Sequence, residues 1–207
     1  MSDSSVLLIP ILLCLCFGGL LVAVFAGIYF FINRSVRGVN RTWGDLGMTT
    51  GLTLKPAAMF SQPELNGKFR QRPIRVYTYS SGTQRYRTTF TSVALSINNP
   101  NNSVLEITPA GTVGNFFGKM IKAQDAEIGN PAFDARFVIK SDPQDSALKV
   151  LGNPKVQNEL LDIPDVFRIE LEGSSLKYSK RGLEDNAEYL KKLFNSLSDL
   201  ADWIERT

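Results

Sequence analysis

Antiparallel strands are predicted most clearly by residues 74–97, which read IRVYTYSSGTQRYRTTFTSVALSI. Val76 alternates with Arg75 and Tyr77, which gives one apolar and one polar side, and this two-residue period is typical of a half-buried strand. A Ser-Ser-Gly turn separates this run from a second alternating one. We therefore expect two strands joined as a hairpin.

Further strands are predicted on both sides of this hairpin, at residues 65–69, 104–108, 136–140, 166–171 and 175–179. Helices are predicted from 141 to 152, after 153, and most clearly from 185 to 205. This order predicts an α+β domain over residues 43–207, with a mostly antiparallel sheet, helices on one face and a long C-terminal helix.

The last helix has an apolar stripe at spacings of three and four residues: Leu190, Leu193, Leu197, Leu200 and Ile204. We expect this stripe to pack on the domain's own sheet. The alternative is self-association, although two heptads are few for a coiled coil.

A long apolar run precedes the domain. Residues 6–32 contain no charged residue, and a helix of this length would span ~40 Å, more than the ~30 Å hydrocarbon core of a bilayer. A transmembrane helix over 6–32 is therefore predicted, with an extracytoplasmic N-terminus at 1–5 and a basic juxtamembrane linker at 33–42. The alternative is a cleaved signal peptide, which would need a basic start and a shorter apolar core.

Arginines set the predicted orientation. Arg34, Arg37 and Arg41 follow the apolar run, and positive flanks stay on the cytoplasmic side. We therefore expect a single-pass protein of the plasma (inner) membrane whose domain is cytoplasmic. Small residues at positions 19, 23 and 27 form a ridge that would let a second helix approach: Gly19, Ala23 and Gly27. The alternative is the ordinary frequency of small residues in such helices.

Several reaction classes are excluded by composition. The chain has no histidine, and its two cysteines, Cys14 and Cys16, lie in the apolar run. This removes histidine-based general-base catalysis, thiol catalysis in the domain and most transition-metal sites. No catalytic residue, metal site, cofactor or small-molecule ligand is predicted. The remaining enzymatic alternative is a membrane-tethered hydrolase or transferase that uses carboxylates and a divalent ion around Asp134 and Asp142.

Charge is unevenly distributed along the domain. Residues 43–124 have a net charge of +6 and residues 125–207 a net charge of −5. The basic part interleaves cations with aromatic residues, and its candidate surface residues are Lys68, Arg70, Arg72, Arg75, Tyr77, Tyr79, Arg85, Tyr86 and Arg87. Such a surface suits lipid headgroups or an acidic partner. The alternatives are a solvated strand face balanced by the acidic half and, third, a single-stranded nucleic acid site.

Residues 130–143, NPAFDARFVIKSDP, resemble a segment of uncharacterised bacterial single-pass membrane-anchored proteins that reads FDxRFxIxSD. The resemblance transfers no activity. It implies that Phe133 and Phe137 form a structural corner with Asp134 and Arg136, the last two as a pair.

Together these features predict a membrane-anchored, non-enzymatic scaffold or accessory subunit. Its expected partners are the lipid bilayer and a membrane protein or a second copy of the chain, and nucleic acid is not expected.

Overall fold

A computed structural model describes residues 4–206 except 59–60, 84–86 and 112–123, and it does not describe the side chains of 4–17, 28–29, 31–36 and 124–125. Within these residues, nine strands form one sheet in the order β1-β2-β3-β4-β9-β8-β5-β7-β6. Their bounds are β1 Thr53–Lys55, β2 Glu64–Phe69, β3 Arg72–Ser81, β4 Thr88–Ser96, β5 Val104–Pro109, β6 Gln124–Ala126, β7 Phe137–Asp142, β8 Arg168–Glu172 and β9 Ser175–Arg181. The helices are α1 Ser4–Thr50, α2 Pro131–Arg136, α3 Asp145–Leu151, α4 Pro154–Leu161 and α5 Ala187–Ile204.

Every pair of neighbouring strands is antiparallel. The hairpin predicted over residues 74–97 is β3 and β4, paired with Tyr77 opposite Ser92. The preceding turn is tighter than the sequence suggests, because Arg70 and Gln71 both have positive φ and join β2 to β3 with two residues. This is the backbone of a type I′ hairpin turn.

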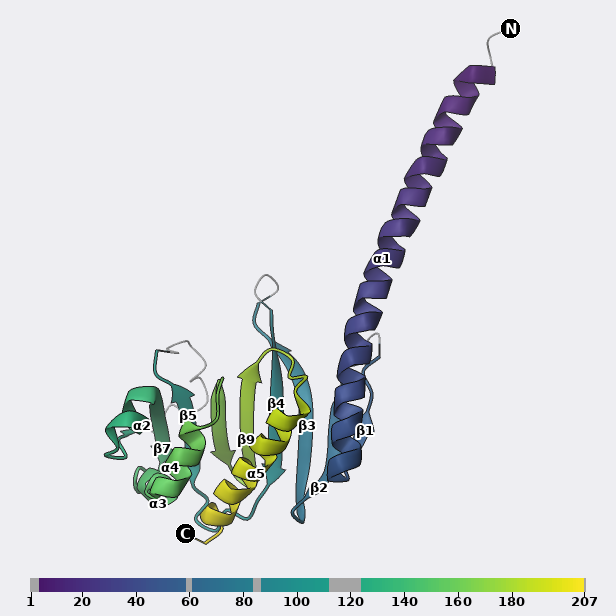
Figure 1. Cartoon of the computed structure of the whole chain (residues 1–207). Helices are drawn as coiled ribbons and strands as arrows, with labels where there is room; N and C mark the ends of the chain where they lie inside the picture. Colours follow the sequence, from purple (N-terminus) through teal and green to yellow (C-terminus); the bar gives the residue numbers. More distant parts are fainter. Residues whose placement is uncertain (1–3, 59–60, 84–86, 112–123, 207) are drawn as a thin grey trace.

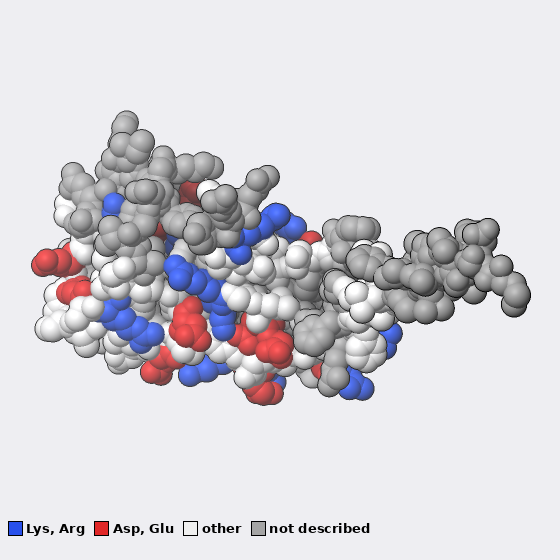
Figure 2. Space-filling view, turned by 90° about the horizontal axis from the view of Figure 1, so that it is seen from above, with Lys and Arg blue, Asp and Glu red and all other residues white. Residues whose placement is uncertain are grey.

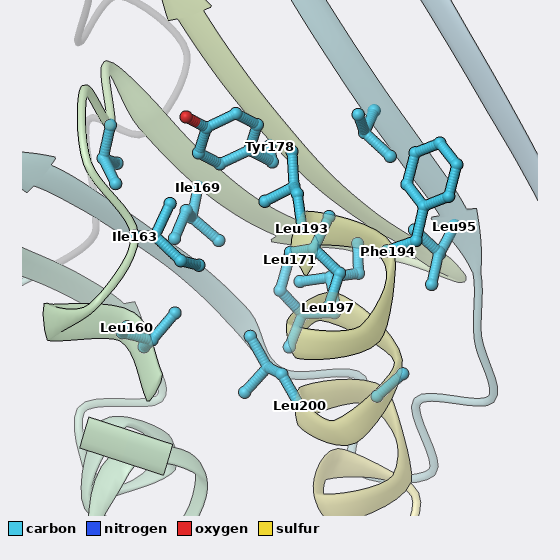
Figure 3. Packing of buried hydrophobic residues seen from close by; sticks show 14 of the residues in the cluster. Leu95, Leu160, Ile163, Ile169, Leu171, Tyr178, Leu193, Phe194, Leu197 and Leu200 are labelled. Atoms are coloured by element: carbon cyan, nitrogen blue, oxygen red, sulfur yellow. The ribbon is translucent and has the colours of Figure 1, made fainter. Parts of the chain in front are cut away.

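The helices lie on one face of the sheet, as the sequence predicts. Figure 1 shows α5 across the middle of this face, with α3 and α4 on the same side near β5 and β7. The apolar stripe of α5 is buried against the sheet, with Leu197 fully buried and Leu193 2% exposed. Figure 3 shows Leu193 and Leu197 of α5 in one cluster with Leu171 and Tyr178 of the sheet. The stripe therefore packs within its own domain.

One prediction about the N-terminal region is contradicted. Among the residues that the structure describes, no helix is both long and apolar enough to cross a membrane. This finding overturns the transmembrane helix predicted over 6–32, and with it the single-pass inner-membrane location. The structure shows a single helix, α1, which continues without a break through the basic segment 33–42 and ends at Thr50.

The C-terminal part of α1 belongs to the core of the domain. Trp43 and Leu46 are almost fully buried, and the helix contacts β1, β2 and α5. The Trp43 Nε1 donates a hydrogen bond of 2.8 Å to the Glu184 carbonyl oxygen, just before α5. A close approach at Gly47 requires glycine, because a Cβ there would lie 2.7 Å from the carbonyl oxygen of Leu52. The C-terminal part of α1 is therefore packed into the domain.

Candidate functional site

Two of the predicted basic residues pair with acids at the C-terminal end of the chain. Arg70 forms an ion pair of 2.6 Å with Asp199, and Arg72 lies 2.5 Å from Asp202 and 2.7 Å from Glu205. Hydrogen bonds from Arg72 hold the pKa of the Glu205 carboxyl below its usual value. These contacts tie the β2–β3 turn to α5.

The other predicted residues lie in different places. Lys68 and Arg87 are exposed, while Arg85 and Tyr86 lie outside the described residues. By strand register, Arg75, Tyr77 and Tyr79 lie on the sheet face opposite the helices, which we call the open face.

A chain of four rings crosses the open face. Tyr77 and Tyr79 have ring centroids 6.1 Å apart, Tyr79 stacks on Phe90 at 5.2 Å, and Phe90 meets Phe167 at 4.7 Å. We call these four residues the aromatic band. Aromatic neighbours at such distances stabilise one another beyond the area that they bury. The band joins β3, β4 and the segment before β8 into one surface.

Four cations lie over the rings of the aromatic band. Arg75 is 4.8 Å from the ring centroid of Tyr77, and Lys177 is 5.6 Å from that of Tyr79. Arg168 and Arg181 lie 5.6 and 5.1 Å from the ring of Phe167. These distances suit cation–π attraction. The open face thus combines cations with aromatic rings, and half of these residues come from the later part of the chain.

Carboxylates neutralise most of these cations. Arg168 lies 3.2 Å from Glu106 and 3.0 Å from Glu170, and Lys177 lies 2.9 Å from Glu170. Burial raises the pKa of Glu106, whose side chain is 6% exposed. Burial also acts to raise the pKa of Glu170, but hydrogen bonds from Lys177 and Arg168 leave it below its usual value. At the β2 edge, Arg75 pairs with Glu64 at 2.6 Å.

Two hollows lie near the ends of the aromatic band. The first, of about 430 Å³, is lined among the described residues by Gly111, Asp165, Val166, Phe167 and Arg181. The second, of about 330 Å³, lies beside Arg75 and is lined by Asn66, Gly67, Pro73, Ile74, Arg75, Ala94, Leu95, Ser96 and Ser175. Both are at the small end of the range for ligand sites.

Asp134 and Arg136 take different partners. The Asp134 carboxylate accepts hydrogen bonds from the backbone N–H groups of Ile128 and Gly129, at 3.1 and 3.0 Å. Arg136 donates to the carbonyl oxygens of Leu161 and Ile163. Both side chains therefore fix loops around α2.

The carboxylate–metal alternative gains no support at this corner. Asp142 is exposed, and the structure shows no group of three or more metal-ligating acids, cysteines or histidines among the residues it describes.

The small-residue ridge and the flanking arginines are on α1. Gly19, Ala23 and Gly27 are exposed, and a Cβ at either glycine would have no atom within 4 Å. Arg37 and Arg41 are exposed, whereas the side chain of Arg34 lies outside the described residues.

A buried polar cluster on the helix-covered face was missed by sequence reasoning. The hydroxyl groups of Tyr178 and Tyr189 lie 2.7 Å apart, and Lys180 pairs with Glu184. Burial raises the pKa of Tyr189 to about 12. Each group has a partner within the cluster, which links β9 to the start of α5. We interpret it as structural.

Comparison with models of protein families gives no match, and neither does comparison with curated proteins. The fold is similar to that in the crystal structure of the mycobacterial trehalose monomycolate transport factor A, TtfA. The TM-score is 0.59 at 11% identity, and the match covers 81% of this chain and 94% of that one. At this identity the likeness shows a shared fold.

Proposed function

We propose that this chain is a non-enzymatic accessory factor in lipid transport, and that its domain contacts lipid headgroups through the open face. The observation that carries the proposal is the aromatic band with its cations. Cations and half-exposed tyrosines beside one another are typical of surfaces that meet the polar region of lipids. The fold it shares with a transport factor for trehalose monomycolate supports the same role.

The non-enzymatic part of the proposal rests on the available chemistry. The chain has no histidine, and its two cysteines lie at positions 14 and 16, outside residues 43–207. Three carboxylates of the open face, Glu64, Glu106 and Glu170, are held in ion pairs with Arg75, Arg168 and Lys177. Carboxylates paired in this way suit a surface that binds a ligand better than a site that transfers protons.

A partner protein is the second contact that we propose, and it uses α1. Large apolar side chains on this helix are strongly exposed, including Leu20 at 62%, Val22 at 69% and Phe25 at 69%. Contiguous exposed apolar surface marks an interaction site. An accessory factor of this kind would bind lipid with its domain and a protein with α1.

Site-specific photo-cross-linking of the full chain in its native cells tests both contacts. A photoreactive phenylalanine analogue would replace Tyr77 on the open face, Val22 on α1, or the exposed Lys192 of α5 as a control. We expect a lipid adduct at Tyr77, a protein adduct at Val22, and neither at Lys192. Equal adducts at Tyr77 and Lys192, or none at Tyr77, would refute the lipid-binding role of the open face.

A further inference from the structure

The hollow beside Arg75, which we call the Arg75 hollow, is formed by a local lack of large side chains. Asn66, Arg75, Ala94 and Lys177 lie side by side in one row across β2, β3, β4 and β9. Ser96 is paired with Ser175 in the neighbouring row, and both serines are exposed. Small side chains between Arg75 and Lys177 therefore leave the volume of about 330 Å³ open to solvent.

One edge of the Arg75 hollow is a fixed polar network. Glu64 accepts a hydrogen bond of 2.8 Å from the Asn66 amide and one of 2.6 Å from Arg75 Nε. The guanidinium is also held over the ring of Tyr77. Within the described part of the chain, Asn66 Oδ1 and the terminal nitrogens of Arg75 have no hydrogen-bond partner. The hollow thus offers a free acceptor, free donors and serine hydroxyls.

Charge balance decides which ligand these groups suit. Arg75 is neutralised by Glu64, and Lys177 by Glu170. An anion would have to compete with these carboxylates, whereas a neutral ligand with hydroxyl groups could use the remaining donors and acceptors without disturbing either pair. Sugar hydroxyls both donate and accept hydrogen bonds, so they match these groups.

We propose that the Arg75 hollow binds the neutral, hydroxyl-rich sugar headgroup of a glycolipid. This inference rests on the proposed lipid-binding function and names the class of lipid. The hollow is shallow and small, so it holds one or two sugar units, while the acyl chains stay outside it. The aromatic band lies next to it and extends the contact along the sheet.

Vesicle flotation with the full chain tests this site. The probes are phosphatidylcholine vesicles that contain digalactosyl diacylglycerol, a neutral disaccharide lipid, or phosphatidylglycerol, an anionic lipid. Ser96→Tyr fills the hollow without changing charge. The matched control is Thr88→Tyr, an exposed position on the same face and the same strand but at its other end. Asn66→Leu removes the amide.

We expect the glycolipid vesicles to bind best, and Ser96→Tyr and Asn66→Leu to weaken this binding by about fivefold or more, as the loss of one to two hydrogen bonds predicts. Thr88→Tyr should bind like the unmodified chain. Stronger binding to phosphatidylglycerol, or glycolipid binding unchanged in Ser96→Tyr, would overturn the proposal. A lipid adduct at Tyr77 together with no preference for the glycolipid would refute this inference alone, and no adduct at Tyr77 would refute the proposed function.

Discussion

Replacement of Trp43 by phenylalanine tests whether the C-terminal part of α1 is part of the domain core. The side chain is completely buried, and its Nε1 donates to the Glu184 carbonyl oxygen at 2.8 Å. Trp43→Phe leaves this carbonyl without its donor, at a cost of about 1–3 kcal/mol. The smaller ring also leaves a cavity that costs about 1 kcal/mol more. We therefore expect the free energy of unfolding to fall by about 2–4 kcal/mol.

Urea unfolding of the full chain, followed by circular dichroism, measures this change. The matched control is Trp203→Phe, because Trp203 is only partly buried and its Nε1 donates to Lys149 at a longer distance, 3.2 Å. The control should lose about 1 kcal/mol or less. An equal loss in both variants, or a loss below about 0.5 kcal/mol for Trp43→Phe, would show that α1 does not contribute to the core as described.

Three further predictions concern stability. The hydrogen bond from Arg72 lowers the pKa of Glu205, so the ionised carboxylate stabilises the fold above its usual pKa, and this stabilisation is lost as the pH falls through the lowered pKa. In an acid titration followed by circular dichroism, the Glu205→Gln variant should therefore lose less stability than the unmodified chain. Gly47→Ala should lower the free energy of unfolding in urea by about 1–3 kcal/mol, because its Cβ meets a carbonyl oxygen at 2.7 Å, whereas Gly44→Ala, with its nearest atom at 3.7 Å, should be neutral or stabilising. Asn186→Ala removes the N-cap of α5 and should lower the melting temperature through a loss of about 1 kcal/mol.

Local patterns located most elements of the domain, because alternation and capping act over a few residues. The predicted helix 185–205 corresponds to α5, Ala187–Ile204, and the predicted strand 175–179 lies within β9. The order of strands was not predictable in this way. β9 lies between β4 and β8, and β5 between β8 and β7, because long-range packing sets these neighbours. The pairing of strands that are far apart in the sequence cannot be predicted from the hydrophobic alternation within each strand.

The residues of the open face could be predicted only where they lie in one strand. Arg75, Tyr77 and Tyr79 alternate within β3, so their common side could be read directly from the sequence. Lys177 and Arg181 join them only because β9 pairs with β4, which places Arg181 opposite Phe90. The alternation of β9 itself puts these two cations on one side, but nothing local indicates which sheet face that side belongs to.

The arginines of the β2–β3 turn show why a charge difference along the chain does not by itself locate a binding surface. The basic segment 43–124 and the acidic segment 125–207 fold onto each other, and Arg70 and Arg72 pair with Asp199 and Asp202 of α5, more than a hundred residues away. On the face seen from above in Figure 2, positive and negative side chains are accordingly intermixed.

Exposed pairs such as Arg70 with Asp199 contribute about 0–1 kcal/mol each, so their main effect is to set which surface remains available to a ligand. The arginines of the β2–β3 turn and the acids of α5 therefore neutralise one another beside the helix-covered face of the sheet. The open face is then distinguished by its rings, its hollows and its hydrogen-bonding groups, because its cations are also largely paired with acids. A ligand of this domain should therefore be recognised by shape and hydroxyl groups, and its binding should change little with salt concentration. Binding that weakens steeply as salt is added would instead require unpaired cations, and would contradict this account.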